Sequence, residues 1–289
     1  MSSISFIINP VSGTGKAKKI PAYIEAHFKQ LGRSYNIRYT EYAQHAKLLV
    51  AEELEKGSTT IVAVGGDGTV NEIGAALLNT NGTLGIIPTG SGNGLARHLN
   101  ISMNPSKAIE TAISGQAIKI DCGELNGRPF FCTAGMGFDA VVAKRFSVLK
   151  GRGLFNYIVA SLKEYRNFKP EKVRDQNQNE YNGFLLSFCN ANQYGNNAYI
   201  CPDANISDGQ LNLIEVPLLP LVYIPVFISK LLNRNLRQGK YYRSIPFSKM
   251  SLHKKTKGAL HIDGEPIEDS DKIEIKCLPQ SLSIMVPSK

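Results

Sequence analysis

A glycine-rich turn at residues 65–69, GGDGT, constrains the fold of this chain more than any other segment. It follows an apolar run at residues 60–64 and precedes residues 70–78, whose apolar side chains recur at helical spacing. This order predicts a strand, a tight turn and the start of a helix. Glycines allow the backbone to approach a ligand closely, and the N-terminus of a helix attracts anions. The turn therefore predicts a phosphate site, with an ordinary glycine turn as the alternative that the motif alone leaves open.

The first half of the chain alternates between strand and helix patterns around this turn. Strands are predicted at residues 4–8, 35–40, 60–64 and 84–88, and helices at residues 20–31, 46–54, 70–78, 95–99 and 105–113. Such alternation predicts a mainly parallel sheet with right-handed crossovers, whose turns gather at the carboxyl ends of the strands. Three turns rich in small residues would then line one crevice: residues 9–15, 65–69 and 90–94.

Two familiar nucleotide-binding patterns do not fit the first of these turns. A P-loop would need a glycine where Pro10 stands and a Ser or Thr where Ala17 stands. A Rossmann fingerprint would need a third glycine in register with Gly13 and Gly15. We therefore expect neither family.

From about residue 121 the pattern changes to strands that follow one another directly. A hairpin is predicted around Asn126 and Gly127, and further strands at residues 184–189, 210–216, 250–253, 259–263, 272–278 and 281–286. A helix is predicted at residues 150–165, and the polar residues 174–181 are predicted to form an exposed loop or hairpin tip.

These patterns predict two domains. Residues 1–122 form an α/β domain built on the parallel sheet, and residues 123–279 form a mainly antiparallel β domain. A return of the last residues, 280–289, to the first domain is left open.

The net charge predicts an anionic partner. The 289-residue chain has a formal charge of +9, from 33 Lys and Arg against 24 Asp and Glu. Nucleic acid, a phosphorylated ligand and an acidic membrane surface all fit this charge. Nucleic acid is disfavoured, because the chain has no Trp and no stripe of alternating aromatic and basic residues.

Cysteine usage and hydropathy predict a cytoplasmic protein. The 5 cysteines are widely spaced, odd in number and without a CxxC pair, which is typical of reduced thiols and gives no support to a disulfide framework or a zinc site. The N-terminus lacks the pattern of a secretory signal. The longest uncharged apolar stretch, residues 216–229, is shorter than the ~20 residues of a membrane-spanning helix and contains three prolines.

Two clusters of carboxylates are candidates for chemistry. Residues 203–209, DANISDG, are rich in oxygen ligands and suit a hard cation such as magnesium, with a type I turn as the alternative. Asp263 follows a predicted strand and is either a general base or a hairpin residue.

Taken together, these segments resemble the diacylglycerol kinase catalytic-domain family, in particular its bacterial soluble lipid kinases and the related sphingosine kinases. The resemblance covers nearly the whole chain and depends on motifs in a fixed order. They are NPVSG at 9–13, TE at 40–41, GGDGT at 65–69, NE at 71–72, PTGSGN at 88–93, IDCG at 120–123, GMGFD at 135–139, DGQL at 208–211 and DGE at 263–265. NAD kinases and phosphofructokinases share the GGDGT motif alone.

The resemblance implies a three-layer α/β domain like those of NAD kinases and phosphofructokinases, followed by an antiparallel β-sandwich that takes the lipid. It implies a nucleotide site in the crevice between these domains. The positions that match ATP-contacting residues of the family are Asn9, Pro10, Val11, Ser12, Gly13, Thr40, Gly66, Asp67, Gly68, Thr69, Val70, Asn71, Glu72 and Ser91.

The resemblance also assigns roles to single carboxylates. Asp67 would help to hold magnesium and the phosphates, and Asp263 matches the family's proton acceptor. A structural Mg²⁺ site would use Asp208 with the positions of Asn205 and Gln210, and Asp121 matches an aspartate linked to that site.

The implied reaction is phosphoryl transfer from ATP to a lipid hydroxyl, with diacylglycerol as the first candidate acceptor. Many bacterial members have Thr where Ser91 stands and Asp where Gly94 stands, so a sphingoid base or another lipid alcohol remains an alternative. An NAD kinase-like enzyme and a module that binds nucleotide and lipid without turnover are the remaining alternatives.

A lipid acceptor implies contact with a membrane. We expect a cytoplasmic protein that associates peripherally with the anionic inner face of the membrane, through residues 144–166 or residues 216–232. Homodimerisation is left open.

Overall fold

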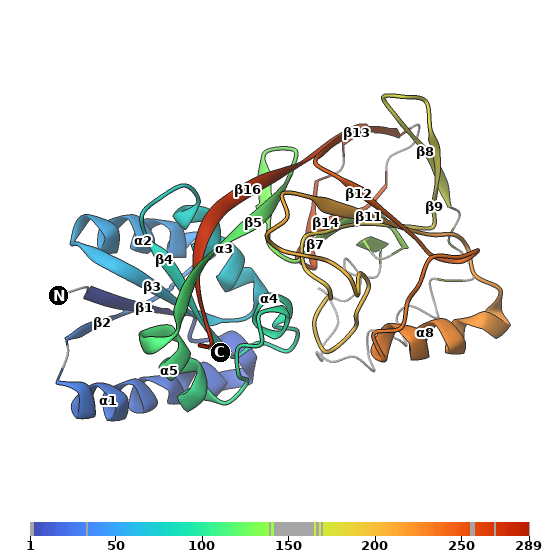
Figure 1. Cartoon of the computed structure of the whole chain (residues 1–289). Helices are drawn as coiled ribbons and strands as arrows, with labels where there is room; N and C mark the ends of the chain where they lie inside the picture. Colours follow the sequence, from blue (N-terminus) through green and yellow to red (C-terminus); the bar gives the residue numbers. More distant parts are fainter. Residues whose placement is uncertain are drawn as a thin grey trace. The chain divides into compact units, whose positions relative to one another are not determined.

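The computed structural model describes residues 3–32, 34–138, 140–141, 165, 168, 170–254, 258–268 and 270–288 (Figure 1). The chain divides into two compact units. Unit 1 contains Met1–Ile120 and Gln280–Lys289, and unit 2 contains Asp121–Pro279. The boundary expected from the sequence lies between residues 122 and 123.

Unit 1 is built on a parallel sheet. Its strands are β1 (Ser3–Ile8), β2 (Tyr35–Tyr39), β3 (Ser58–Gly65), β4 (Thr83–Pro88) and the last part of β16 (Lys272–Val286), in the order β2-β1-β3-β4-β16. Ile8 pairs with both Tyr39 and Val64, and Gly65 pairs with Pro88. The strands β1 to β4 therefore end at one common edge of the sheet.

Helices cover both faces of this sheet. They are η1 (Ser12–Lys19), α1 (Ile20–Leu31), α2 (His45–Glu55), α3 (Asp67–Leu77), α4 (Gly94–His98) and α5 (Pro105–Ser114). Helix α1 contacts α5 on one face, and α2 contacts α3 on the other (Figure 1). Helix α1 ends at Gly32, whose φ is 60°, and α5 begins after Asn104, whose Oδ1 accepts the Lys107 N–H at 3.3 Å. The predicted three-layer α/β domain is confirmed.

Unit 2 contains an antiparallel six-stranded sheet and part of a second sheet. The first has the order β12-β11-β10-β7-β14-β15, made of Arg243–Phe247, Leu211–Val216, Leu185–Cys189, Thr133–Gly137, Leu260–Ile262 and Glu265–Ile267. The second contains β5 (Gln116–Leu125), β6 (Arg128–Phe130), β8 (Glu171–Asp175), β9 (Glu180–Gly183), β13 (Lys249–Lys254) and the first part of β16. The 3-10 helix η2 (Leu221–Tyr223) runs directly into α8 (Ile224–Leu232).

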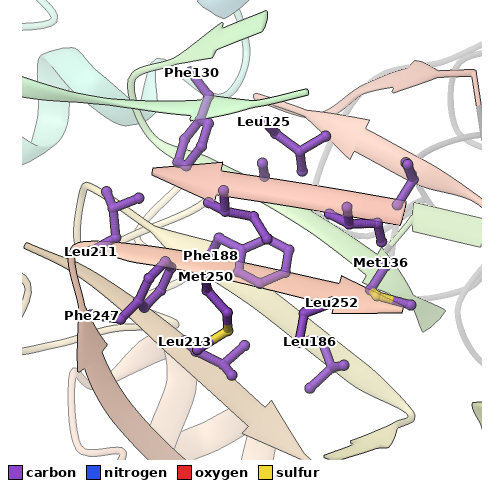
Figure 2. Packing of buried hydrophobic residues seen from close by; sticks show 14 of the residues in the cluster. Leu125, Phe130, Met136, Leu186, Phe188, Leu211, Leu213, Phe247, Met250 and Leu252 are labelled. Atoms are coloured by element: carbon purple, nitrogen blue, oxygen red, sulfur yellow. The ribbon is translucent and has the colours of Figure 1, made fainter. Parts of the chain in front are cut away.

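The core of unit 2 is formed by side chains from both sheets (Figure 2). Leu125 and Leu252 come from the second sheet, and Met136 and Phe188 come from the first. Strand β10 is buried on both faces, because Phe188 packs in this core while Cys189 packs in a second cluster on the opposite face. The predicted antiparallel β-sandwich is confirmed.

Several elements differ from the sequence prediction. The two strands expected at 272–278 and 281–286 are one strand, β16, which continues through Gln280 at a φ of 48°. The polar residues 174–181 do form a hairpin between β8 and β9, but Asp175 and Tyr181 are buried, so the expectation of exposure is wrong for them. The helix predicted at 150–165 lies outside the described residues, apart from Tyr165.

All five cysteines are free and buried. In the part of the chain that the structure describes, no helix combines the length and the apolar character needed to cross a membrane.

Candidate active site

The turns that follow β1, β3 and β4 lie together at the carboxyl edge of the unit 1 sheet. The Asn9 N–H donates to the Val64 carbonyl oxygen at 3.0 Å, and the Thr89 N–H donates to the Gly65 carbonyl oxygen at 2.9 Å. Thr40 follows β2 at the same edge, and its N–H donates to the last residue of β1 at 2.9 Å. Segments that are far apart in the sequence thus form one backbone surface.

Side chains tie these turns to one another. The Asn9 amide Nδ2 donates to Thr69 Oγ1 at 3.2 Å, and Asn9 Oδ1 accepts the Val11 N–H at 3.2 Å. The Thr89 hydroxyl donates to Ser12 Oγ at 3.0 Å, and both of these side chains are buried. The first turn is therefore fixed to α3 on one side and to the turn after β4 on the other.

The backbones approach so closely that glycine is required at two positions. Gly13 has a φ of 62°, and a Cβ there would lie 1.9 Å from the Thr89 carbonyl oxygen. A Cβ on Gly90 would lie 2.6 Å from the Cα of Gly66. Gly66 is also the N-cap of α3, which places the positive end of that helix at this edge. This surface of backbone groups beside a helix N-terminus suits an anion such as a phosphate.

Asp67 anchors the third turn to the start of α3. Its Oδ2 accepts the Asn93 N–H at 2.8 Å, and its Oδ1 accepts the Gly94 N–H at 2.7 Å. The Asn93 amide Nδ2 donates to the Gly90 carbonyl oxygen at 2.8 Å, while its buried Oδ1 has no hydrogen-bond partner in the structure. Asp67 thus positions the turn, and its predicted contact with magnesium and phosphates stays a prediction.

The remaining residues predicted to contact ATP also lie in this part of unit 1. Val11 is 80% exposed, Ser91 is exposed, and Thr40 is half-buried. The others lie in the turn after β1 or in the first turns of α3, and all are partly accessible except the buried Val70. They are Pro10, Gly68, Val70, Asn71 and Glu72.

In unit 2, the Asp263 carboxylate is held by three backbone N–H groups. Its Oδ1 accepts from Cys132 at 2.8 Å and from Thr133 at 3.0 Å, and its Oδ2 accepts from Phe131 at 3.0 Å. Asp263 and Gly264 have φ of 46° and 82° and form the two-residue turn between β14 and β15. Asp263 is therefore a hairpin residue whose carboxylate has one fixed orientation.

Asp121, also in unit 2, has a fully buried carboxylate and is hydrogen-bonded to a loop made of residues 205–210. Its Oδ2 accepts the Gly209 N–H at 2.7 Å, and its own N–H donates to the Ile206 carbonyl oxygen at 2.7 Å. Within the loop, Asp208 Oδ1 accepts the Gln210 N–H at 3.0 Å. The loop that carries the predicted metal ligands is therefore bound directly to Asp121.

The Cys277 thiol lies close to Asp121 and Asp208. Burial raises the pKa of Cys277, and the nearby carboxylates of Asp121 and Asp208 raise it further, to about 12. A thiol with so high a pKa remains protonated at neutral pH, so it is not a thiolate ligand for a soft metal.

Comparison with known proteins identifies the family. The model of the diacylglycerol kinase catalytic domain matches residues 3–125. The model of the YegS C-terminal NAD kinase beta sandwich-like domain matches residues 132–286, more than half of the chain. The chain belongs to the diacylglycerol kinase catalytic-domain family.

Relatives in this family match over most of their length. A probable lipid kinase YegS-like protein of Serratia proteamaculans is 26% identical, over 96% of this chain and 92% of its own. A probable lipid kinase YegS of Shigella dysenteriae serotype 1 is 29% identical, over 90% of this chain and 88% of its own. The crystal structure of a putative diacylglycerol kinase from Bacillus anthracis shares the fold, with a TM-score of 0.78 at 21% identity over 99% of this chain and 96% of that one.

Membership of the diacylglycerol kinase catalytic-domain family makes the chain a lipid kinase and implies ATP as phosphoryl donor, with a divalent metal. Among the described residues, no group of three or more His, Cys, Asp or Glu side chains is arranged to hold a metal. The loop at residues 205–210 carries the Asp208 carboxylate together with amide and carbonyl oxygens, and its Gly209 N–H donates to the carboxylate of Asp121 on β5. Oxygen donors of this kind fit a hard cation such as Mg²⁺ or Ca²⁺.

Some residues that shape a family site were missed by the sequence reasoning. The Asn190 amide Nδ2 donates to the carbonyl oxygens of Asp121 and Phe131, at 3.0 Å each, and so connects the strand that carries Asp121 with the segment that holds Asp263. These partners lie 69 and 59 residues away, and nothing in the local pattern marks Asn190. Asn93 and Thr89, in contrast, lie inside the PTGSGN motif and had a sequence signal.

Proposed function

We propose that this lipid kinase transfers the γ-phosphoryl group of ATP to the hydroxyl of a membrane lipid, with diacylglycerol as the first candidate acceptor. The observation that carries the proposal is the close approach of the glycine turns after β1, β3 and β4, where Gly13 and Gly90 have no room for a side chain. Such a surface beside the N-terminus of α3 favours the phosphates of a nucleotide.

In the proposed reaction unit 1 binds the donor. Backbone N–H groups of the turns and the positive end of α3 hold the phosphates, and Asp67 keeps the third turn in place through its bonds to Asn93 and Gly94. When bound, Mg²⁺ supplies positive charge that neutralises the phosphate oxygens. Positioning and electrostatic stabilisation provide most of the catalysis in phosphoryl transfer.

Asp263 is the proposed proton acceptor. The lipid hydroxyl oxygen forms a bond to the γ-phosphorus, the bond between that phosphorus and the oxygen bridging to the β-phosphate breaks to release ADP, and the hydroxyl proton passes to the Asp263 carboxylate. Three backbone N–H donors support this role, because they hold the carboxylate in one orientation.

We propose Mg²⁺ as the metal at the loop of residues 205–210, held by Asp208 with oxygens of Asn205 and Gln210. Asp121 holds the loop itself in place. The buried charge of Asp121 and the oxygen-rich loop support this assignment. The site is structural, since it holds the loop against the β5 strand that carries Asp121.

A transfer assay with labelled ATP tests the function. The acceptors are diacylglycerol, monoacylglycerol, sphingosine, ceramide and undecaprenol, each in mixed vesicles, with NAD in solution. The expected result is labelled phosphatidic acid from diacylglycerol. If another lipid alone were labelled, that lipid would be the acceptor and the reaction class would be unchanged. Label in NADP alone, or in no acceptor, would contradict lipid phosphorylation.

We also propose that the protein acts at the anionic inner face of the membrane, where its acceptor lies. The charge of +9 supports this location. Of the two segments predicted to make the contact, residues 144–166 fall outside the described residues apart from Tyr165, and residues 216–232 are described in full.

A further inference from the structure

The exposed large apolar side chains of unit 2 are concentrated in one short segment. Among the described residues of this unit they are Leu218, Leu221, Val222 and Val226, with exposed fractions of 48%, 63%, 87% and 44%. We call these four residues the docking patch. They lie on the loop before η2, on η2 itself and on the first turn of α8, where no other element of the described chain covers them.

The segment that carries the docking patch is firmly attached to unit 2. Leu219 and Phe227 are buried in the cluster on the outer face of the six-stranded sheet, together with Val216. The Leu219 carbonyl oxygen also accepts a hydrogen bond from the Tyr165 hydroxyl. Buried residues of the segment are therefore anchored in unit 2, while the residues of the docking patch beside them stay exposed.

Aromatic rings and lysines flank the docking patch. Tyr223, next to Val222, packs against Tyr241 with the ring centroids 4.5 Å apart. The Lys230 ammonium lies 5.8 Å from the Tyr223 ring centroid, and the Lys240 ammonium lies 5.3 Å from the Tyr241 ring centroid. Tyrosine is favoured at the boundary between lipid and water, and lysines beside it can reach lipid headgroups.

The surrounding sequence carries positive charge only. Residues 216–242 contain no Asp or Glu, and their basic residues are Lys230, Arg234, Arg237 and Lys240. This charge is complementary to an anionic lipid surface. It disfavours a symmetric contact between two copies of the chain, because the same basic residues of both copies would then be brought together.

From these observations we infer that unit 2 docks on an anionic bilayer through η2 and the start of α8. The docking patch enters the lipid, and Lys230 and Lys240 contact the headgroups, with Tyr223 and Tyr241 at the boundary. The biological purpose of docking rests on the proposed function, since docking would bring the kinase to an acceptor embedded in the membrane. Binding to vesicles, however, is measured without catalysis.

Sedimentation with vesicles of phosphatidylglycerol and phosphatidylcholine in equal parts tests the inference. Leu221→Ser combined with Val222→Ser is expected to lower vesicle affinity at least ~10-fold, because two aliphatic side chains no longer enter lipid. Leu48→Ser on α2 of unit 1 is the control, since Leu48 is 56% exposed and lies outside the patch. Lys230→Glu with Lys240→Glu is expected to lower the vesicle affinity and to make that affinity less dependent on salt concentration.

Activity on two forms of the acceptor separates docking from catalysis. The Leu221→Ser, Val222→Ser variant is expected to phosphorylate a dispersed short-chain diacylglycerol at the wild-type rate and to be slower on diacylglycerol in vesicles. Patch-dependent vesicle binding by a wild-type protein that phosphorylates no lipid would support docking and contradict only the proposed function. Vesicle affinity that is unchanged in both double variants would overturn the inference, as would a dimer in solution that Leu221→Ser with Val222→Ser dissociates while vesicle binding persists.

Discussion

The Asn93 backbone N–H donates to Asp67 Oδ2 at 2.8 Å, across 26 residues of sequence. With the bond from Gly94 to Oδ1, it joins the turn after β4 to the first residue of α3. The third glycine turn is thus held in place by the aspartate of the second, so this carboxylate fixes the arrangement of the two turns.

Removing the Asp67 carboxylate is expected to loosen this turn. In Asp67→Ala the two N–H groups lose an ionised acceptor, and hydrogen bonds of this kind contribute about 1.5–3 kcal/mol. We expect a lower free energy of unfolding in urea and at least ~10-fold weaker ATP binding by calorimetry. Asp67→Asn keeps one acceptor oxygen and should be intermediate. If Asp67→Ala bound ATP with wild-type affinity, Asp67 would have no role in nucleotide binding.

Gly13 provides a test of the close approach between turns. Gly13→Ala would place a Cβ 1.9 Å from the Thr89 carbonyl oxygen, so the first turn must move and ATP affinity is expected to fall. Gly32 is the matched control, because its φ is 60° against 62° for Gly13 and it has open space around it. Gly32→Ala should cost about 1 kcal/mol of stability and leave ATP binding unchanged. Equal ATP affinities for the two variants would argue that the first turn does not form the phosphate surface.

Glu53 is expected to make unit 1 sensitive to acid. Burial raises the pKa of this carboxyl, but hydrogen bonds from Ser5, Lys56, Arg38 and Asn36 outweigh the effect and lower the pKa to about 2. Because the pKa is lower in the folded state than the ordinary value of 4.5, the stabilisation is complete above about pH 4.5 and is lost as the pH falls towards about 2.

Urea unfolding across this pH window measures the effect. The wild type should lose on the order of 3 kcal/mol of unfolding free energy that Glu53→Gln does not lose, since the variant has no carboxylate to protonate. Glu52→Gln is the control, because the Glu52 side chain is 49% exposed and its pair with Arg38 is worth at most about 1 kcal/mol. A pH profile of Glu53→Gln that parallels the wild type would show that other groups carry the acid sensitivity.

The loop at residues 205–210 is expected to respond to magnesium. Added Mg²⁺ should raise the melting temperature of the wild type and a chelator should reverse the rise, with a stabilisation of about 2.7 kcal/mol when the ion is at 100 times its Kd. Asp208→Asn should abolish this response, whereas Asp203→Asn, an exposed carboxylate of the same segment, should retain it. An Asp208→Asn protein that still responds to Mg²⁺ like the wild type would place the metal elsewhere.

Local chemistry explains why several helix ends and turns were predictable. Asn104 with Pro105 marks the start of α5, and Gly32 marks the end of α1, through interactions within a few residues. The Asn126–Gly127 and Asp263–Gly264 turns follow in the same way from left-handed backbone conformations that these residues tolerate.

The features that escaped prediction depend on distant partners. Nothing near Gln280 in the sequence shows that β16 continues through it, because pairing with β13 at one end and β4 at the other decides the strand. The three N–H groups that hold Asp263 lie more than a hundred residues earlier in the chain. Sequence spacing therefore could not predict how many of them contact this carboxylate or how they are oriented. The roles of Asp263 and Asp208 came from the family resemblance and not from the local pattern.

Asp263→Asn tests the central claim, phosphoryl transfer with Asp263 as proton acceptor, most directly. Asn tolerates the left-handed φ of 46° and keeps one acceptor oxygen for the N–H groups of Cys132 and Thr133, so the variant should fold. We predict that Asp263→Asn binds ATP with wild-type affinity while lipid phosphorylation falls ~10²–10⁴-fold. The control Asp271→Asn, which changes an exposed carboxylate nearby in the sequence, should keep both the ATP affinity and the lipid phosphorylation of the wild type. Near-normal turnover by a folded Asp263→Asn protein would contradict the account.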